Sequence, residues 1–327
     1  MLEQSLDTAS LPNIDEIRTA QELVYSVMQP TPQLVWPLLC QRLGAEVWVK
    51  HENHTPTGAF KARTAVVYAA ELFRENSNIT GLVTATRGNH GQSVALAARR
   101  FGVAAYIVVP RGNSTEKNAA MRAQGGTLIE FGDDYQESKE HAQKLAAGHG
   151  WHFVPSYHRD IVKGVATYWL EFFTAVPNLD VVYVPIGQGS GISSCTAVRN
   201  GLNLRTKIVG VVARGAPAYA LSFEAGRKIA APVTTLLADG MACRIPDEAS
   251  LAVVLQNVDH IVQVTEEEIA QAMKVIFTDT HNVAEGAGAA GLAAAIKESN
   301  LLKSKRVGLV ISGGNVDRDM FARVLLD

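Results

Sequence analysis

Short apolar runs alternate along this chain with stretches of helical periodicity, and this alternation limits the possible folds more than any other feature of the sequence. The run Ala104–Val109 carries no charged residue, which is typical of a strand covered on both faces in a parallel sheet. Repeated strand–helix units predict an α/β fold built on open, mostly parallel, twisted sheets with helices on both faces. The predicted strands are residues 46–50, 81–84, 104–109, 127–131, 181–186, 208–212, 260–264 and 306–311. The predicted helices are residues 62–73, 91–101, 115–124, 134–146, 168–174, 266–277 and 288–298.

The length of the chain favours two domains over one. It has 327 residues, of which 47% are hydrophobic, enough for a sizeable core. Four strand–helix alternations lie between residues 73 and 151, and we expect this segment to form a small inserted domain. Residues 1–72 and 152–327 are then expected to form the large domain.

Composition excludes several classes of protein. The 30 basic and 32 acidic side chains nearly balance, so nothing indicates binding to nucleic acid or to an anionic membrane. Cys40, Cys195 and Cys243 are widely spaced and form no CxxC pair, so neither a disulfide framework nor a zinc site is indicated. Residues 1–20 lack a basic segment followed by an apolar run, and no stretch is long enough to span a membrane. A cytoplasmic location is therefore predicted.

One lysine stands where a reactive amine is expected. Lys61 ends the turn Thr55-Pro56-Thr57-Gly58-Ala59-Phe60-Lys61, which follows a predicted strand and opens a predicted helix. A desolvated ammonium loses its proton readily, and a neutral amine can form a Schiff base with a carbonyl compound, including the aldehyde of pyridoxal phosphate. The alternative is an ordinary solvated lysine in the first turn of a helix.

Three glycine-rich turns follow three of the predicted strands. They are residues 86–92 (TRGNHGQ), 187–191 (GQGSG) and 312–315 (SGGN). In an open parallel sheet the carboxyl ends of the strands share one edge, where ligands bind. These turns and the Lys61 turn are therefore expected to converge on one crevice.

The turn at residues 187–191 has the composition of an anion-binding loop, because glycine lets backbone N–H groups approach an anion and a helix follows. Ser190, Ser193 and Ser194 are expected to add hydroxyl donors. The alternative is a dinucleotide fingerprint, but its third glycine position holds Ile192. The next strand ends in Arg214 rather than in an acidic residue.

Taken together, these motifs resemble the ordered signature of fold-type-II pyridoxal-phosphate enzymes. The resemblance runs from about residue 31 to residue 315 and is strongest to the branch of threonine/serine dehydratases and serine racemases; some hydroxyectoine-utilisation dehydratases share its general appearance. The motifs that carry it are GAFK (58–61), GNHGQ (88–92), the loop 187–191, ADG (238–240), EGAGA (285–289) and SGGN (312–315). It implies a two-domain fold, similar to the tryptophan synthase β subunit, with pyridoxal 5'-phosphate bound between the domains.

The resemblance also implies roles for individual residues. Lys61 would form the Schiff base and act as the general base, Phe60 would pack beside the cofactor ring, and Asn89 would bind the ring oxygen. Ser312 would face the pyridine nitrogen and Glu285 would lie near the ring. The residues implied at the cofactor phosphate and ring edge are Gly187, Gln188, Gly189, Ser190, Gly191 and Gly240. The residues implied on the substrate side are Thr86, Arg87, Gly88, Asn89, His90 and Asp239.

The implied activity is that of an ammonia-lyase, which converts a β-hydroxy amino acid, threonine or serine by default, into a 2-oxo acid and ammonia. A serine hydroxyl at the ring nitrogen would leave that nitrogen unprotonated, so that the carbanion is short-lived and elimination is favoured over other outcomes. The implied assembly is a homodimer. The alternatives are an amino-acid racemase, a dinucleotide-dependent oxidoreductase and a non-catalytic amino-acid-binding protein.

The chain departs from the family pattern at three places. Arg87 replaces the usual serine; arginine is a poor proton shuttle but binds carboxylates well. It therefore argues against racemisation and suggests a more acidic substrate, such as a hydroxyaspartate-like or hydroxyectoine-derived compound. Arg214 stands where metal-binding members supply acidic ligands, so we expect no metal and a fixed positive charge beside the site. Gln188 and Ser190 replace glycines in the phosphate loop.

Overall fold

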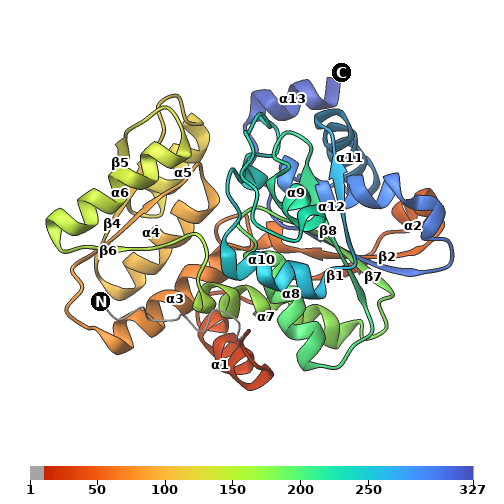
Figure 1. The fold of residues 1–327 in the computed structure, drawn as a ribbon, viewed down its shortest axis with the longest axis horizontal. Coiled ribbons are helices and arrows are strands. Elements are labelled where there is room, and N and C mark those ends of the chain that lie inside the picture. The colour runs from red at the N-terminus through yellow and green to blue at the C-terminus, as the bar shows by residue number, and fades with distance from the viewer. Residues whose placement is uncertain (1–10, 327) are drawn as a thin grey trace.

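The computed structural model describes residues 11–326, which form two sheets, one mostly and one entirely parallel, that lie side by side with their helices as two units (Figure 1). The expectation that residues 1–20 carry no leader falls partly on residues 1–10, which lie outside the described part of the chain. The larger sheet has six strands in the order β1-β2-β10-β7-β8-β9, and only β1 runs antiparallel to its neighbour. Its strands are β1 (Gln33–Val35), β2 (Glu46–His51), β7 (Val181–Pro185), β8 (Lys207–Ala213), β9 (His260–Val264) and β10 (Arg306–Ile311).

The smaller sheet has four parallel strands in the order β5-β4-β3-β6. They are β3 (Gly81–Ala85), β4 (Ala104–Val109), β5 (Gly126–Glu130) and β6 (His152–Phe153). This sheet extends two residues past the predicted domain boundary at residue 151, and the division of the chain at residues 73–151 stays a prediction.

The helices are joined to the strands mostly by short turns. They are α1 (Ile14–Tyr25), α2 (Pro37–Leu43), α3 (Ala62–Glu75), α4 (Asn89–Phe101), α5 (Thr115–Ala123), α6 (Tyr135–His149), α7 (Arg159–Ala175), α8 (Ser190–Gly201), α9 (Ala218–Ala225), α10 (Glu248–Asn257), α11 (Glu266–Thr280), α12 (Gly286–Lys297) and α13 (Arg318–Leu326), with the short 3-10 helices η1 (Glu52–His54), η2 (Asp239–Met241) and η3 (Ser299–Leu301). Within the described residues, none of these helices is long and apolar enough to cross a membrane.

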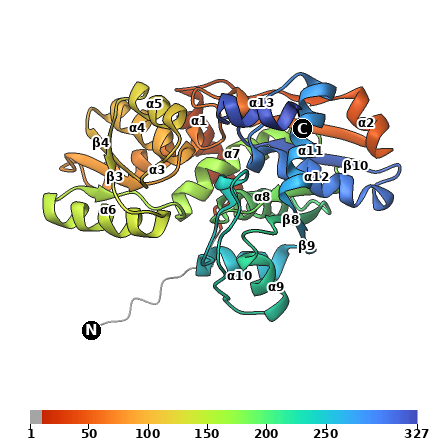
Figure 2. The same ribbon diagram turned by 90° about the horizontal axis from the view of Figure 1, so that it is seen from above.

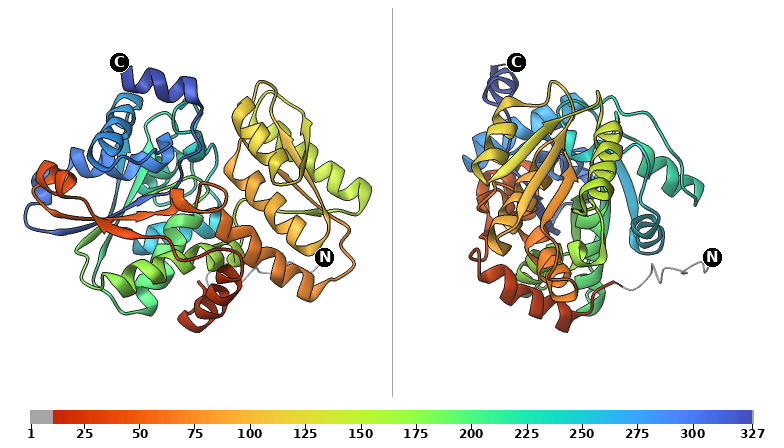
Figure 3. Two further views of the ribbon diagram at one scale, coloured as in Figure 1. Left: turned by 180° about the vertical axis from the view of Figure 1, so that it is seen from behind. Right: turned by 90° about the vertical axis from the view of Figure 1, so that its left-hand side faces the viewer.

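Both faces of each sheet are covered, as the apolar strands predict. In the larger sheet, Tyr183 and Val209 pack with α2, α11 and α12 on one face, whereas Val182 and Ile208 pack with α7 and α8 on the other. In the smaller sheet, α3, α4 and α5 cover one face and α6 covers the other, which is seen from above in Figure 2. Helices α3 and α7 run along the base between the two units (Figure 3).

The α/β class and all eight predicted strands are confirmed, with ends that differ by at most one residue. The sequence analysis missed β1 and β6, because these strands are too short to show an alternating pattern. It was wrong about the start of α7, predicted at residue 168 and found at Arg159. Its first half contains Gly164 and the β-branched Ile161, Val162 and Val165, residue types with low helix propensity that hide a helix from a reading of the sequence. Its Gly164 lies so close to α3 that a Cβ there would be 2.5 Å from the Arg63 carbonyl oxygen.

Candidate active site

A cavity of about 160 Å³ lies between the two units at the carboxyl ends of β3, β7 and β10. Every residue to which the resemblance gives a role beside the cofactor or the substrate lines it: Phe60, Lys61, Thr86, Arg87, Gly88, Asn89, His90, Gly187, Gln188, Gly189, Ser190, Gly191, Asp239, Gly240, Glu285 and Ser312. In the structure the glycine-rich turns converge on one cavity, as predicted. The role of each residue stays a prediction.

The Lys61 turn is held against the end of β10 by backbone hydrogen bonds. The amide of Phe60 donates to the carbonyl of Ser312 (2.9 Å), and the amide of Gly314 donates to the carbonyl of Gly58 (2.9 Å). In turn, the amide of Glu285 donates to the carbonyl of Gly313 (3.0 Å). These bonds hold the Lys61 turn next to Glu285, about 225 residues away in the chain, and next to residues 312–314, about 250 residues away.

Lys61 points its amine into the cavity. Its Nζ lies 3.5 Å from Ser190 Oγ and 5.1 Å from the centre of the Phe60 ring. No ion-pair partner for Lys61 occurs among residues 11–326. Burial lowers the pKa of this amine from 10.5 to about 8. At pH 7 roughly a tenth of the amine is then unprotonated, far more than for a solvated lysine, and nucleophilic attack on a carbonyl requires this form.

The loop at residues 187–191 lines the cavity and leads into α8. The helix begins after Gly189, and no side chain caps its amino end. Gly189 has φ 96°, and a Cβ there would lie 1.6 Å from Ser250 Oγ, so only glycine fits. Ser190 adds its hydroxyl. Uncapped amides at the positive end of a helix suit an anionic group such as phosphate.

A second uncapped helix end opens into the same cavity. Helix α4 begins after Gly88, whose amide donates to Thr86 Oγ1 (3.0 Å), and no side chain caps its first turn. Asn89, the first residue of α4, donates from Nδ2 to Glu285 Oε1 (2.7 Å) and accepts from Asn315 Nδ2 (2.8 Å). The neighbouring His90 is buried, which lowers its pKa to about 3, so this ring is neutral.

Three ionisable side chains, Lys117, Asp239 and Glu285, face one another in the cavity. Lys117 of α5 forms an ion pair with Asp239 of η2. Burial raises the pKa of Glu285 well above its usual range, Lys117 opposes this increase and Asp239 adds to it. Glu285 Oε2 is buried and has no hydrogen-bond partner among the described residues. The positive charge of Lys117 therefore balances the carboxylate of Asp239, which would otherwise repel a charged Glu285.

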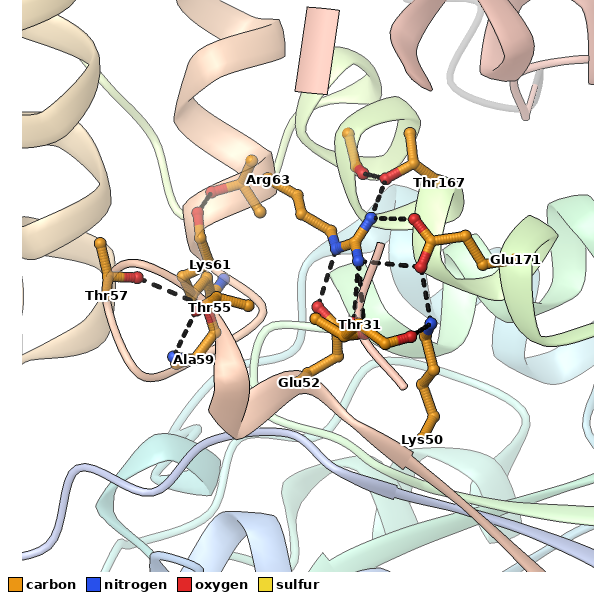
Figure 4. A network of polar contacts seen from close by, with 12 residues as sticks. Thr31, Lys50, Glu52, Thr55, Thr57, Ala59, Lys61, Arg63, Thr167 and Glu171 are labelled. Atoms are coloured by element: carbon orange, nitrogen blue, oxygen red, sulfur yellow. Dashed lines mark hydrogen bonds and ion pairs between the residues drawn. The ribbon is translucent and has the colours of Figure 1, made fainter. Parts of the chain in front are cut away.

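A buried network of charges fixes the start of α3, directly after Lys61 (Figure 4). The Arg63 guanidinium donates to both oxygens of Glu52 (2.8 and 3.0 Å) and of Glu171 (2.6 and 3.0 Å). Lys50 donates to Glu171 (2.6 Å) and to the carbonyl of Thr31 (2.6 Å). The two cations have no exposed side-chain surface, and two carboxylates balance them. Paired in this way, the charges hold β2, α3 and α7 in one arrangement.

Some predicted contributors lie elsewhere. Ser194 donates to the carbonyls of Val162 and Ser190, and Ser193 accepts from Tyr157, so neither hydroxyl lines the cavity. Both hydroxyls point from α8 towards α7 or the residues just before it. The prediction that they add hydroxyl donors to the anion site was wrong.

Arg214 is exposed and lines a separate surface depression with β9. The prediction that Arg214 places a positive charge beside the cavity was therefore wrong. Within residues 11–326 no group of three His, Cys, Asp or Glu side chains is placed to hold a metal ion.

The sequence analysis missed several residues of the cavity wall, including Lys117, Tyr135, Ser156 and Tyr168. Lys117 lies in the first turn of a polar helix, and nothing in its local sequence marks it. Tyr135 and Ser156 are hydrogen-bonded to each other (2.8 Å) although 21 residues separate them. Only the folding of the small sheet against the large one brings these side chains to the cavity.

The comparisons with known proteins agree with this geometry. The family model described as pyridoxal-phosphate dependent enzyme matches residues 24–313. The L-threonine ammonia-lyase of Thermotoga maritima is 36% identical over 313 residues, which are 95% of this chain and 78% of that protein. The L-threo-3-hydroxyaspartate ammonia-lyase of Saccharomyces cerevisiae is 30% identical over 96% of this chain and 97% of that protein. The solved structure of maize serine racemase has a TM-score of 0.88 at 29% identity and covers 97% of this chain and 98% of its own. This chain belongs to the family of pyridoxal-phosphate-dependent enzymes.

Proposed function

We propose that this protein is a pyridoxal-phosphate-dependent ammonia-lyase that converts a β-hydroxy amino acid into a 2-oxo acid and ammonia. The observation that carries the proposal is the meeting of Lys61 and the amino end of α8 in one cavity. A cofactor with an aldehyde and a phosphate needs an amine with a lowered pKa and an anion-binding helix end, and both are present. The ammonia-lyases of Thermotoga maritima and Saccharomyces cerevisiae support the reaction class.

When bound, the cofactor supplies an electron sink that makes the Cα proton of an amino acid acidic. The residues of this chain would then do the rest. The phosphate would be held by the amides of residues 189–191 and the Ser190 hydroxyl. The Lys61 amine would take the Cα proton as general base, because its lowered pKa lies close to neutral pH.

Two further side chains suit elimination. Ser312 follows β10 and offers a hydroxyl rather than a carboxylate to the cavity. A hydroxyl cannot hold a protonated pyridine nitrogen as a carboxylate can, so the electron sink would be weaker and loss of the β-hydroxyl would compete well. Asn89 is fixed between Glu285 and Asn315, so its amide presents one defined direction to the ring oxygen.

A more acidic substrate is the second candidate, and Arg87 is the observation that favours it. This residue is exposed at the mouth of the cavity and has no ion-pair partner among residues 11–326. The Saccharomyces cerevisiae relative is named for a β-hydroxy amino acid with a second carboxylate. Arginine binds such a group in a two-pronged fashion.

Racemisation is the weaker alternative, although maize serine racemase has the same fold. It needs a proton donor on the face of Cα opposite Lys61, and Arg87 does not release a proton at accessible pH. Membership of the pyridoxal-phosphate family removes the dinucleotide-dependent oxidoreductase. A protein that binds amino acids without turnover is separated from a lyase by measured product.

The main test is release of 2-oxo acid from the cofactor-loaded enzyme with threonine, serine and 3-hydroxyaspartate. Borohydride reduction followed by peptide mapping should place the cofactor on Lys61. Turnover of none of these substrates, or attachment to another lysine, would contradict the proposal.

A variant with Arg87→Ser separates the two substrate candidates. If Arg87 binds a second carboxylate, kcat/KM for 3-hydroxyaspartate should fall roughly 10–150-fold, as expected for the loss of a charged hydrogen bond of about 1.5–3 kcal/mol. Threonine and serine should be affected less. A change in kcat/KM of less than about twofold on every substrate would mean that Arg87 does not select the substrate, and would favour a threonine/serine dehydratase.

The predicted homodimer and cytoplasmic location belong to the same proposal. Light scattering of the purified protein checks the first, and fractionation of the source cells checks the second.

A further inference from the structure

The first turn of α5 joins the two units across the mouth of the cavity through polar contacts. Ser114, the residue that caps α5, donates to the carboxylate of Asp317, and the amide of Arg318 donates to the carboxylate of Glu116 (3.1 and 3.2 Å). Lys117 completes the set by its ion pair with Asp239. Helix α5 packs on the small sheet, whereas Asp239 and α13 belong to the unit of the large sheet.

Lys117 differs from the other two contacts because it lies inside the cavity. Its side chain is 12% exposed. Its Cδ lies so close to Gly88 that a Cβ on that residue would be 2.9 Å from it. The methylene groups of Lys117 therefore pass over the turn that leads into α4, and its ammonium reaches Asp239 on the other side of this turn. Burial alone would lower the pKa of Lys117, but Asp239 and Glu285 raise it above its usual value, so the ammonium is charged at neutral pH.

This placement puts a cation beside the uncapped amino end of α4. The amides that follow Gly88 have no capping side chain, and an anion bound there would come within reach of the Lys117 ammonium. Without such an anion, Asp239 is the carboxylate that the ammonium contacts. Asp239 is 25% exposed and can be hydrated when it is released.

We propose that Lys117 is a substrate-binding residue that exchanges Asp239 for the carboxylate of the amino acid. The inference rests on the proposed function, because it requires an amino acid in this cavity. The exchange replaces one carboxylate by another at the same ammonium, so the Lys117 ammonium stays paired at both stages, while the released Asp239 is hydrated at its exposed part. Asp239 is then an internal competitor of the substrate, and the ion pair sets how tightly the carboxylate is bound.

Competition has a signature that a merely structural ion pair lacks. Removing Lys117 should weaken carboxylate binding, whereas removing the charge of Asp239 should strengthen it, although both changes break the same pair. If the pair only holds α5 in place, both variants should weaken binding together.

The experiment measures equilibrium binding of L-alanine and L-alaninamide to the cofactor-loaded enzyme, by calorimetry or by cofactor absorbance. Neither ligand has a β-leaving group, and only alanine carries the carboxylate. Lys117→Met should weaken alanine binding about tenfold, the lower end of the range for a charged hydrogen bond because the side chain is partly exposed. It should leave alaninamide binding unchanged. Asp239→Asn should tighten alanine binding threefold or more, roughly.

Two further variants serve as controls. Lys117→Arg keeps the charge and should retain alanine affinity within about threefold, in case the methionine variant folds poorly. Glu116→Gln weakens the neighbouring contact of α5 with Arg318 outside the cavity, and it should change the affinity of neither ligand.

Equal weakening of alanine by Lys117→Met and Asp239→Asn, equal effects on alanine and alaninamide, or no effect in either variant would overturn the proposal. Turnover of the unaltered enzyme in such a case would leave the lyase function standing. Failure of the unaltered enzyme to bind alanine or turn over any amino acid would contradict both.

Discussion

Replacing Lys61 by methionine should stabilise the cofactor-free protein at neutral pH while abolishing covalent cofactor binding. The Lys61 amine is buried beside Phe60 and the positive end of α8, and no carboxylate pairs with it among the described residues. A fall in pKa from 10.5 to about 8 means that the protonated form is disfavoured in the folded state by about 3 kcal/mol. Methionine has nearly the same volume and carries no charge, so it removes this penalty without opening a cavity.

The pH dependence follows from the direction of the shift. Below about pH 8, Lys61 is protonated in both the folded and the unfolded state, and the folded state carries the full penalty. Between about pH 8 and pH 10.5 the folded state releases its proton first, so the stability of the unaltered protein rises relative to the variant. The difference in the free energy of unfolding should be about 3 kcal/mol at pH 7 and about 1 kcal/mol at pH 10.

Urea unfolding of both cofactor-free proteins at pH 7 and pH 10 measures this difference. The exposed Lys144 provides the control, because its replacement by methionine should produce no pH-dependent difference. A Lys61→Met variant no more stable than the unaltered protein at pH 7, or a difference that is the same at both pH values, would refute the reasoning.

Three other outcomes follow from the structure. Gly189→Ala should weaken cofactor binding and lower the melting temperature, because φ is 96° and the new Cβ would meet Ser250, whereas Gly102→Ala, with open space around it, should cost only about 1 kcal/mol and leave cofactor titrations unchanged. Glu171→Gln should cost about 3 kcal/mol or more in urea unfolding, because it removes one carboxylate from a buried charge network, while a change at the exposed Glu130 should stay within about 0.5 kcal/mol. Chelator should leave turnover unchanged, since residues 11–326 hold no group of metal ligands; a loss that magnesium or calcium restores would contradict this expectation.

The sequence by itself determined the class of fold and the chemistry of the main site. Strands of a covered parallel sheet are continuous apolar runs, so a one-dimensional pattern suffices to find them. The glycine-rich turns follow these strands, and the topology of an open parallel sheet then requires them to meet at one edge. The sequence alone therefore predicts that Lys61, Asn89, the loop at residues 187–191 and Ser312 lie together, and all of them line one cavity.

The tertiary structure decided what depends on two distant segments approaching each other. Lys117 enters the cavity where the first turn of α5 forms polar contacts with Asp317 and with Asp239 of η2, and no local signal marks such contacts. Ser194 turned away from the cavity because its position on α8 directs its hydroxyl at α7. Arg214 lies at the expected end of its strand, yet its side chain lines another surface. A strand end fixes the edge of the sheet at which a residue lies, but packing of the neighbouring helices fixes where its side chain points.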